Sequence, residues 1–500
     1  MTVSRSTDSA RARELRKAVR PTGRLRPAVF HLADLVPLST SSVAPAFSIA
    51  AAYGVMVSFA GPQAIMSVIV AFPLFLFSAL IFRQLNIHFP HAGASFFWGT
   101  SVIGRRYGGF QAWVVTLAYF LSLPPILLPA GEYTLQLASS LEWVPPSVVG
   151  NLEWEAVMGI GWALVAAVPL LLGAKPTARF TEAFFGIEIA ILAIFLGIGL
   201  SVLPGHVINP IRPSWFFSTA INPLSFSLAL VAVATILDGW EIDSYASEES
   251  EKPRKDPGIG GIIGAFGALL FYAILYPLML GETPLHALAN STDPLAVWSQ
   301  RLVPSAPWIM LIPILLSTAG GLWLTSFILT RALYAMGRER LIPASFAKLN
   351  RNHVPHVAVL AALGTAGVVV SLQLFVTSLG SFFNLVLSGA GFFLLAEFLL
   401  DSVTGVIFLS VGHRRMPEMS LQPHQHRLLL VGAIFSSVVM AALLIAFFIF
   451  GPTAIGNGID ETLAALLGCG FAFAWWTKKR TRETVHFDEH GSELTAATPR

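Results

Sequence analysis

Acidic residues collect at the end of a long apolar run in the stretch TILDGWEIDSYASEES, residues 235–250. Asp238 and Glu241 are three residues apart, a spacing that places both side chains on one face of a helix. Gly239 and Trp240 stand between them, and glycine weakens a helix at that point. A charge in the middle of a bilayer costs at least about 2.5–3.5 kcal/mol, so an acid there needs a partner, water or a proton. The stretch is either a helix that has reached water or a helix interrupted inside a membrane to form a binding site.

The composition of the chain favours the membrane. Of its 500 residues 55% are hydrophobic and 12% are charged, with a mean hydropathy of +0.69, whereas soluble proteins carry about 25% charged residues. Apolar stretches of about 18 residues or more can cross a bilayer, and the sequence predicts twelve of them. They are residues 33–58, 62–82, 109–137, 154–173, 181–203, 223–246, 259–281, 307–333, 357–378, 381–411, 427–450 and 458–476.

The Lys and Arg residues predict the orientation of these spans. With both termini in the cytoplasm, all of the 31 Lys and Arg residues except Arg212 and Arg301 fall in cytoplasmic segments. This asymmetry follows the positive-inside rule and supports an even number of spans in the cytoplasmic membrane. Residues 1–28 form a basic cytoplasmic tail, for which contact with anionic lipid is a better explanation than nucleic-acid binding. Residues 477–500 form a second, polar cytoplasmic tail.

Two of the predicted spans carry helix-breaking residues near their middles. The first span has Pro37 and Pro45 around a group of small and hydroxyl residues, and the sixth span contains Gly239. Each of these spans opens a block of five, and the odd number turns the second block upside down relative to the first. Corresponding breaks in inverted halves point to a binding site at the midplane, where the amides of a half-helix N-terminus attract an anion such as a carboxylate. The predicted blocks are residues 29–203 and 223–411 of a transport core at 29–411, with two peripheral helices at 427–476.

Three stretches resemble the amino acid–polyamine–organocation (APC) superfamily. HFPHAGASFFWGTSVIGRRYGGFQAWVV, residues 88–115, resembles the family's loop between spans two and three. DGWEIDSYASEESEKPRKDP, residues 238–257, resembles its sixth span and the cytoplasmic exit of that span. TRALYAMGRERLIPASFAKLNRNHVPHVA, residues 330–358, is similar to the signature that follows span eight. SSVAPAFSIA in the first span resembles a branch of bacterial members, but it has Pro45 where the more common pattern has glycines.

The resemblance implies an all-α, multi-pass membrane protein of twelve helices with the leucine-transporter fold. This fold has a 5+5 inverted repeat in which helices 1 and 6 are discontinuous. The implied function is secondary active amino-acid transport by alternating access, with proton symport. The alternatives are a transporter or exchanger of polyamines and cationic amines, and a membrane substrate sensor that does not transport. An enzyme is not supported, because the sequence shows no catalytic motif, and neither a cofactor nor a metal is expected.

The predicted substrate site lies at the two breaks. It consists of Ser41, Ser42, Ala44, Pro45 and Ala46 from the first span and of Thr235, Asp238, Gly239, Trp240 and Glu241 from the sixth. Glu188, in the middle of span five, and Glu241 are the predicted proton-coupling residues, since burial favours the protonated carboxyl. For either acid the alternative is a structural hydrogen bond inside the protein. Thr325 and Ser326 in span eight are candidates for a cation site, although such hydroxyls more often bond their own helix.

For other polar residues the sequence indicates a structural role or leaves the role open. Glu397 and Asp401 are four residues apart in span ten, and two such close carboxyls do not both ionise easily in apolar surroundings. A second proton relay is one interpretation of that pair. Glu248 with Lys252 has the spacing of a solvated ion pair on a helix, and Asp243 stays unassigned. GIGGIIGAFG, residues 258–267, has no following Lys-Ser/Thr, so helix packing explains its glycines better than phosphate binding does.

Overall fold

The computed structural model describes residues 24–373, 379–412, 421–454, 456, 458–477, 486–487 and 493–494. From the N-terminus the helices are α2 (Leu32–Ser42), α3 (Pro45–Ala60), α4 (Ala64–His88), α5 (Ala94–Val102), α6 (Arg105–Ser122), α7 (Pro124–Ser140), α8 (Leu152–Leu172), α9 (Ala174–His206), α10 (Pro223–Ile236) and α11 (Ile242–Tyr245). They continue with α12 (Ile259–Glu282), α13 (Leu285–Ala289), α14 (Pro294–Leu302), α15 (Leu311–Arg338), α16 (His356–Gln373), α17 (Leu379–Ile407), α18 (Pro423–Ala454) and α19 (Ile459–Thr477). The short strands β1 (His486–Phe487) and β2 (Glu493–Leu494) pair antiparallel.

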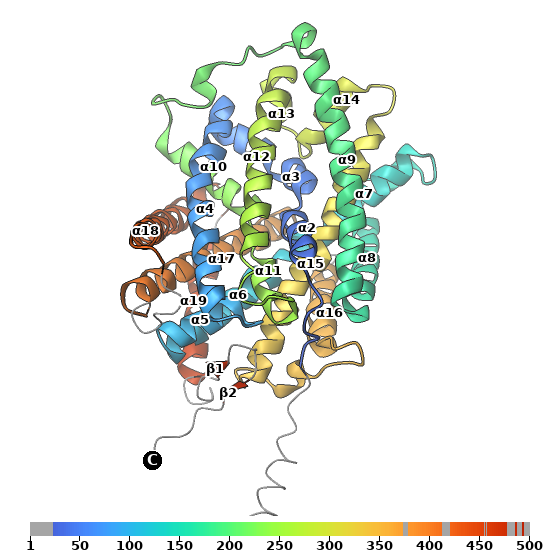
Figure 1. The fold of residues 1–500 in the computed structure, drawn as a ribbon. Helices are drawn as coiled ribbons and strands as arrows, with labels where there is room; N and C mark the ends of the chain where they lie inside the picture. Colours follow the sequence, from blue (N-terminus) through green and yellow to red (C-terminus); the bar gives the residue numbers. More distant parts are fainter. Residues whose placement is uncertain are drawn as a thin grey trace, which may run out of the picture.

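The helices form one bundle with two distinct ends (Figure 1). We call the bottom of Figure 1, where α5 and the two strands lie, the lower face, and the opposite end, with α13 and α14, the upper face. Eight helical stretches of the described residues are long and apolar enough to cross a membrane, and α10 and α16 contain shorter apolar stretches. The chain is therefore a multi-pass, all-α membrane protein, while the count of twelve spans stays a prediction.

The first predicted span is broken where the sequence places its second proline. Helix α2 ends at Ser42, Ala44 adopts the left-handed region with φ of +50°, and α3 begins at Pro45. A proline at the first position of a helix loses no hydrogen bond, because that amide would have no intrahelical partner. The interruption predicted around Pro45 is present.

The sixth predicted span is also broken, and its first helix ends ten residues before the predicted end of the span at residue 246. Helix α10 ends at Ile236, Gly239 has φ of +98°, and the single turn of α11 begins at Ile242. After a 3-10 turn at residues 247–249 the chain is not helical again until α12. The predicted helical pairing of Glu248 with Lys252 is therefore wrong, because the backbone that would align those two side chains is not a helix.

Glycines bring α12 close to the first broken helix. A methyl group on Gly264 would lie 2.9 Å from Cβ of Ser39, and one on Gly260 would lie 3.0 Å from Cβ of Leu35. Small residues allow such close approach of two apolar helices. The stretch GIGGIIGAFG thus packs α12 against α2, as the sequence predicts.

Helix α15 supports both halves of the first broken helix. Most of its side chains are buried, and it packs against α2, α3, α6, α7 and α9. A methyl group on Gly320 would lie 3.3 Å from Oγ of Ser41, and one on Gly321 would lie 3.4 Å from Cβ of Ala44. The glycine pair therefore lets α15 lie directly against the α2–α3 break.

Candidate functional site

The two helix breaks meet inside the bundle. A Cβ atom placed on Gly239 would lie 2.5 Å from the carbonyl oxygen of Ser42 and 2.8 Å from its Oγ. Only a glycine allows this approach, and the positive φ of Gly239 favours glycine as well. The structure therefore brings together the two sets of residues predicted to form one site, which lie almost 200 residues apart in the sequence.

Glu188 fills the N-terminus of the second half-helix. Its side chain is buried in α9, and Oε1 accepts a 3.0 Å hydrogen bond from the amide of Ala46. The next amide, of Phe47, donates to Oγ of Ser317 at 3.2 Å, and Pro45 has no N–H. The first amides of α3 are thus satisfied by side chains of the protein, as helix ends require. A carboxylate does occupy this positive helix end, as the sequence predicts for a substrate, but it belongs to the chain itself.

Glu241 fills the second break in the same manner. Its side chain is fully buried, and its two carboxyl oxygens accept from the amide of Gly239 at 3.0 and 2.9 Å. The hydroxyl of Tyr119 on α6 donates to Oε1 at 2.8 Å. Glu241 therefore folds back over the break that Gly239 creates, and Tyr119 fixes it from a third element.

Trp240 is packed between helices. Its ring stacks on Phe398 of α17 with centroids 5.6 Å apart, and it meets Phe82 of α4 edge-on at 5.0 Å. Nε1 of Trp240 is buried and has no hydrogen-bond partner among the described residues. Asp238, two residues before Trp240, is half-buried. Thr235 belongs to α10, and its side chain lies outside the described part of the chain.

Of the two hydroxyl groups predicted for a cation site, one forms a hydrogen bond within its own helix, and the other is buried on the same helix. Ser326 donates to the carbonyl of Leu322 in its own helix at 2.8 Å, and Thr325 is buried on the same helix. Ser317, two turns earlier in α15, is the hydroxyl that reaches the end of α3. The sequence offered only weak signals for Ser317 and Tyr119, because both act through contacts with residues more than 100 positions away. Among the described residues, no group of three or more His, Cys, Asp or Glu is placed to hold a metal ion.

Asp243, which the sequence leaves unassigned, caps α12. Its Oδ2 accepts hydrogen bonds from the amides of Gly258 and Gly261, the second at 2.7 Å. These amides lie at the start of α12 and have no intrahelical acceptor. The acid therefore joins the short helix α11 to α12, and its role in the structure is that of a helix cap.

Two ion pairs tie the segment after α11 to α15 at the lower face. Arg331 is fully buried and donates to both oxygens of Glu249 at 3.0 and 3.1 Å. Arg338 donates to both oxygens of Glu248 at 2.8 and 2.6 Å. Burial alone would raise the pKa of Glu248, but the charge of Arg338 and its hydrogen bonds lower that pKa to about 2. Such two-point Arg–carboxylate pairs are strong and directional.

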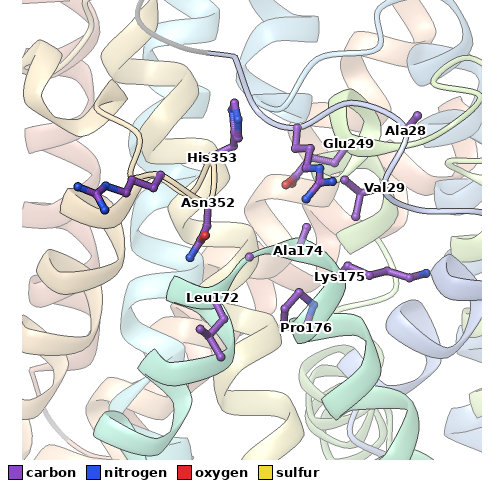
Figure 2. A pocket seen from close by; sticks show the side chains of 12 residues that line it. Ala28, Val29, Leu172, Ala174, Lys175, Pro176, Glu249, Asn352 and His353 are labelled. Carbon is purple, nitrogen blue, oxygen red and sulfur yellow. The ribbon is translucent and has the colours of Figure 1, made fainter.

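A cavity of about 320 Å³ opens at the lower face, beside the start of the first broken helix. Figure 2 shows it between residues 28–29, the α8–α9 turn and the segment that leads to α16, with Lys175 pointing away from the cavity. The amine of Lys175 lies 2.6 Å from a carboxyl oxygen of Asp34 on α2. The lining contains no residue of either helix break. This cavity is thus a hollow next to α2, separate from the place where the breaks meet.

Comparisons with known proteins identify a family and several relatives of this chain. A family model described as amino acid permease matches residues 30–472. The branched-chain amino acid permeases BcaP of Lactococcus lactis and of Bacillus subtilis are 23% and 24% identical over 60% of this chain. The matched regions cover 66% and 65% of those two relatives. The Asc-type amino acid transporter 1 of Mus musculus is 23% identical over 83% of this chain and 76% of its own length.

Proposed function

Because the chain belongs to the amino acid permease family, within the APC superfamily, we propose that it transports amino acids across the cytoplasmic membrane by alternating access as a proton symporter. In this proposal it has twelve spans, an inverted 5+5 repeat and both termini in the cytoplasm, so that the lower face is cytoplasmic. The names of its relatives are those of transporters rather than enzymes.

The observation that carries the proposal is the contact between the two helix breaks. Gly239 lies against the backbone of Ser42. The ends of α2 and α10 and the starts of α3 and α11 therefore converge at a place where both spans are interrupted. Interrupted backbone inside a membrane is tolerated where it is enclosed by protein or lines a cavity. Each half-helix can tilt about its break, which opens the site first to one side and then to the other.

Glu188 supplies a physical basis for coupling to protons. While ionised, its carboxylate accepts the hydrogen bond of the Ala46 amide at the positive end of α3. Once protonated it loses most of its attraction to that helix end, and the carboxylate of an amino acid can take over the amide. Substrate anion and proton then arrive together and leave together, and the net charge beside α3 stays the same.

The acids of the second break would hold the other end of the substrate. Asp238 and Glu241 lie beside the contact with Ser42 and can bind an ammonium group. The same acids favour the alternative of a polyamine or cationic-amine transporter or exchanger, since a second positive charge would also find a partner there. The relatives named branched-chain amino acid permeases favour neutral amino acids as the first substrates to examine.

Uptake by proteoliposomes tests these possibilities. Labelled leucine, alanine, phenylalanine, lysine and putrescine are offered with and without an imposed pH gradient. A proton symporter accumulates one of the amino acids, and a protonophore abolishes the accumulation. Putrescine uptake would support the amine transporter, and flux that needs substrate on both sides would support an exchanger. Specific binding without flux under any gradient would identify a sensor and contradict the proposal.

A further inference from the structure

A second group of buried acids lies on α17, next to the break at Gly239. Glu397 and Asp401 are both buried and one helical turn apart. Oε1 of Glu397 accepts from the hydroxyl of Tyr245 at 2.6 Å and from Oγ of Ser95 at 2.8 Å. These bonds connect α17 with α11, which directly follows the break, and with α5 at the lower face.

Tyr119 connects this group to the acid at the break. Its hydroxyl donates to Glu241 at 2.8 Å, and the same phenol also faces the carboxyl of Glu397. Its ring lies edge-on to that of Tyr245, with centroids 5.8 Å apart. Glu241 and Glu397 are therefore separated by one hydroxyl group that can donate to either of them.

The path continues toward the lower face through Asp401. Ser95, which donates to Glu397, also faces the carboxyl of Asp401, and Nε2 of Gln111 donates to Oδ1 of Asp401 at 3.0 Å. The half-buried Tyr107, in the first turn of α6, lies close to Asp401 and bonds the carbonyl of Leu400 at 2.6 Å. The row of polar groups thus runs from the break to the edge of the bundle near α5.

These acids lack the partners that would keep them ionised. Oε2 of Glu397 and Oδ2 of Asp401 are buried without a hydrogen-bond partner, and among the described residues neither acid forms an ion pair. The titratable groups that face them are Asp238 and Glu241, Tyr119 and Tyr245, and Tyr107 near Asp401, none of which carries a positive charge. Phe398 and Ser402, which follow the two acids in α17, contact Phe75 and Phe82 of α4 and Met440 of α18, none of them charged. A proton is the ligand that removes the unpaired charge and provides the missing donor.

We propose that Glu397 and Asp401, linked by Ser95 and joined to the break by Tyr119, form a proton relay between Glu241 and the lower face. This proposal rests on proton symport as the function, and it gives a proton carried by Glu241 a route to the lower face that does not pass through Glu188. The relay uses side chains of α5, α6 and α17, so its connection to Glu241 is made or broken when the segment after Gly239 moves.

One transfer conserves atoms and charge. Protonated Glu241 gives its proton to the phenol oxygen of Tyr119 while the phenol proton passes to the carboxylate of Glu397. The products are the Glu241 carboxylate, an intact phenol and the Glu397 carboxylic acid. The hydroxyl of Ser95 passes a proton from Glu397 to the Asp401 carboxylate in the same way, and the buried Asp401 releases it to water past the half-buried Tyr107.

Transport by purified Glu397→Gln in proteoliposomes tests the route. Glutamine keeps the shape and accepts from Tyr245 and Ser95, but it cannot carry a proton. We expect accumulation of labelled leucine, or of whichever amino acid the wild type concentrates, to fall at least about tenfold under a pH gradient, while exchange stays close to wild type. Ser402→Ala, which changes a buried hydroxyl next to Asp401, is the matched control and should leave both activities unchanged. Unchanged accumulation, or equal loss of accumulation and exchange in a folded protein, would overturn the relay.

Infrared difference spectra give a readout that needs no substrate. A pH titration of the wild-type protein should show the carbonyl band of a buried, protonated carboxyl that Glu397→Gln removes and Ser402→Ala retains. If that band is absent or survives in Glu397→Gln, the relay is wrong whatever the transport assay shows. If the band behaves as expected but no compound is transported, the proton site stands and the symporter function fails.

Discussion

Glu188 on α9 accepts a 3.0 Å hydrogen bond from the amide of Ala46, although the two residues are 142 positions apart in the chain. This bond places a buried carboxyl at the N-terminus of α3, on the far side of the break from α2. Helix α9 and the broken first span are thus joined by a group that can gain or lose a proton. The strength of the bond depends on that proton, because an ionised acceptor binds an amide about twice as strongly as a neutral one.

Replacing Glu188 by glutamine should separate transport from the proton gradient. The amide oxygen of glutamine still accepts from Ala46, but the side chain no longer titrates. We expect accumulation driven by a pH gradient to fall at least about tenfold, whereas exchange of labelled against unlabelled substrate continues. Both rates are measured in proteoliposomes with the same amount of folded protein.

Glu188→Ala is the companion variant, because it removes the cap of α3 as well as the titratable group. It should lower the melting temperature of the purified protein more than Glu188→Gln does, since a helix cap contributes about 0.5–2 kcal/mol. If pH-driven accumulation by Glu188→Gln matched that of the wild type, Glu188 would be a structural cap without a role in coupling.

Glu241→Gln should weaken the affinity for substrate and, because Glu241 is the first acid of the proposed relay, also lower accumulation driven by a pH gradient. The carboxylate binds the amide of Gly239 through both oxygens and accepts from Tyr119, and glutamine can keep only part of these bonds. If Glu241 also binds the ammonium group of the substrate, its loss should weaken binding about tenfold, or 1.4 kcal/mol. Isothermal titration and the concentration dependence of exchange measure this change. Kinetics identical to the wild type would remove Glu241 from the site.

Gly239→Ala should disturb the contact between the breaks. The new methyl group would lie 2.5 Å from the carbonyl oxygen of Ser42, and alanine would have to adopt φ of +98°. Backbone strain of this kind costs about 1–3 kcal/mol, so we expect a lower melting temperature and a large loss of transport. Gly267→Ala in α12 is the matched control, since no atom lies within 4 Å of its new methyl group. It should be neutral or stabilising, and equal losses in both variants would contradict a special role for Gly239.

The fold could be predicted from the sequence where the signal is local. Apolar runs mark the helices, Pro45 marks the start of α3, and Gly239 marks the second break. The sequence failed at residues 247–258, because the spacing of Glu248 and Lys252 resembles a helical ion pair. The partner of Glu248 is Arg338, 90 positions away, and a non-local salt bridge leaves no periodic signal in a single sequence.

The two helix breaks were predictable from the sequence, but the contacts around them were not. The residues of the two breaks follow from their types and from the topology, and the structure brings them together. The partners that give the acids their surroundings, Ser317 and Tyr119, come from helices with ordinary apolar patterns. A buried serine or tyrosine usually bonds its own helix or a neighbour, so only the packing of three helices shows which of them face the breaks.

The ion pair between Glu248 and Arg338 should make the stability of the lower face depend on acid pH. The pKa of Glu248 is lowered from 4.5 to about 2, because the attraction of Arg338 outweighs the effect of burial. An acid with a lowered pKa in the folded state stabilises the protein above its unfolded pKa, and the benefit is lost as the pH falls toward 2. The full contribution, on the order of 3 kcal/mol, should be constant from pH 5 to 8 and decline between about pH 4.5 and 2.

Melting temperatures of the wild type and of Glu248→Gln across this pH range measure the contribution of Glu248. The two curves should converge as the pH falls, and Glu251→Gln, whose exposed partner is His31, should run close to the wild type. A constant difference between wild type and Glu248→Gln down to the lowest pH would show that the charge of Glu248 does not hold this segment to α15.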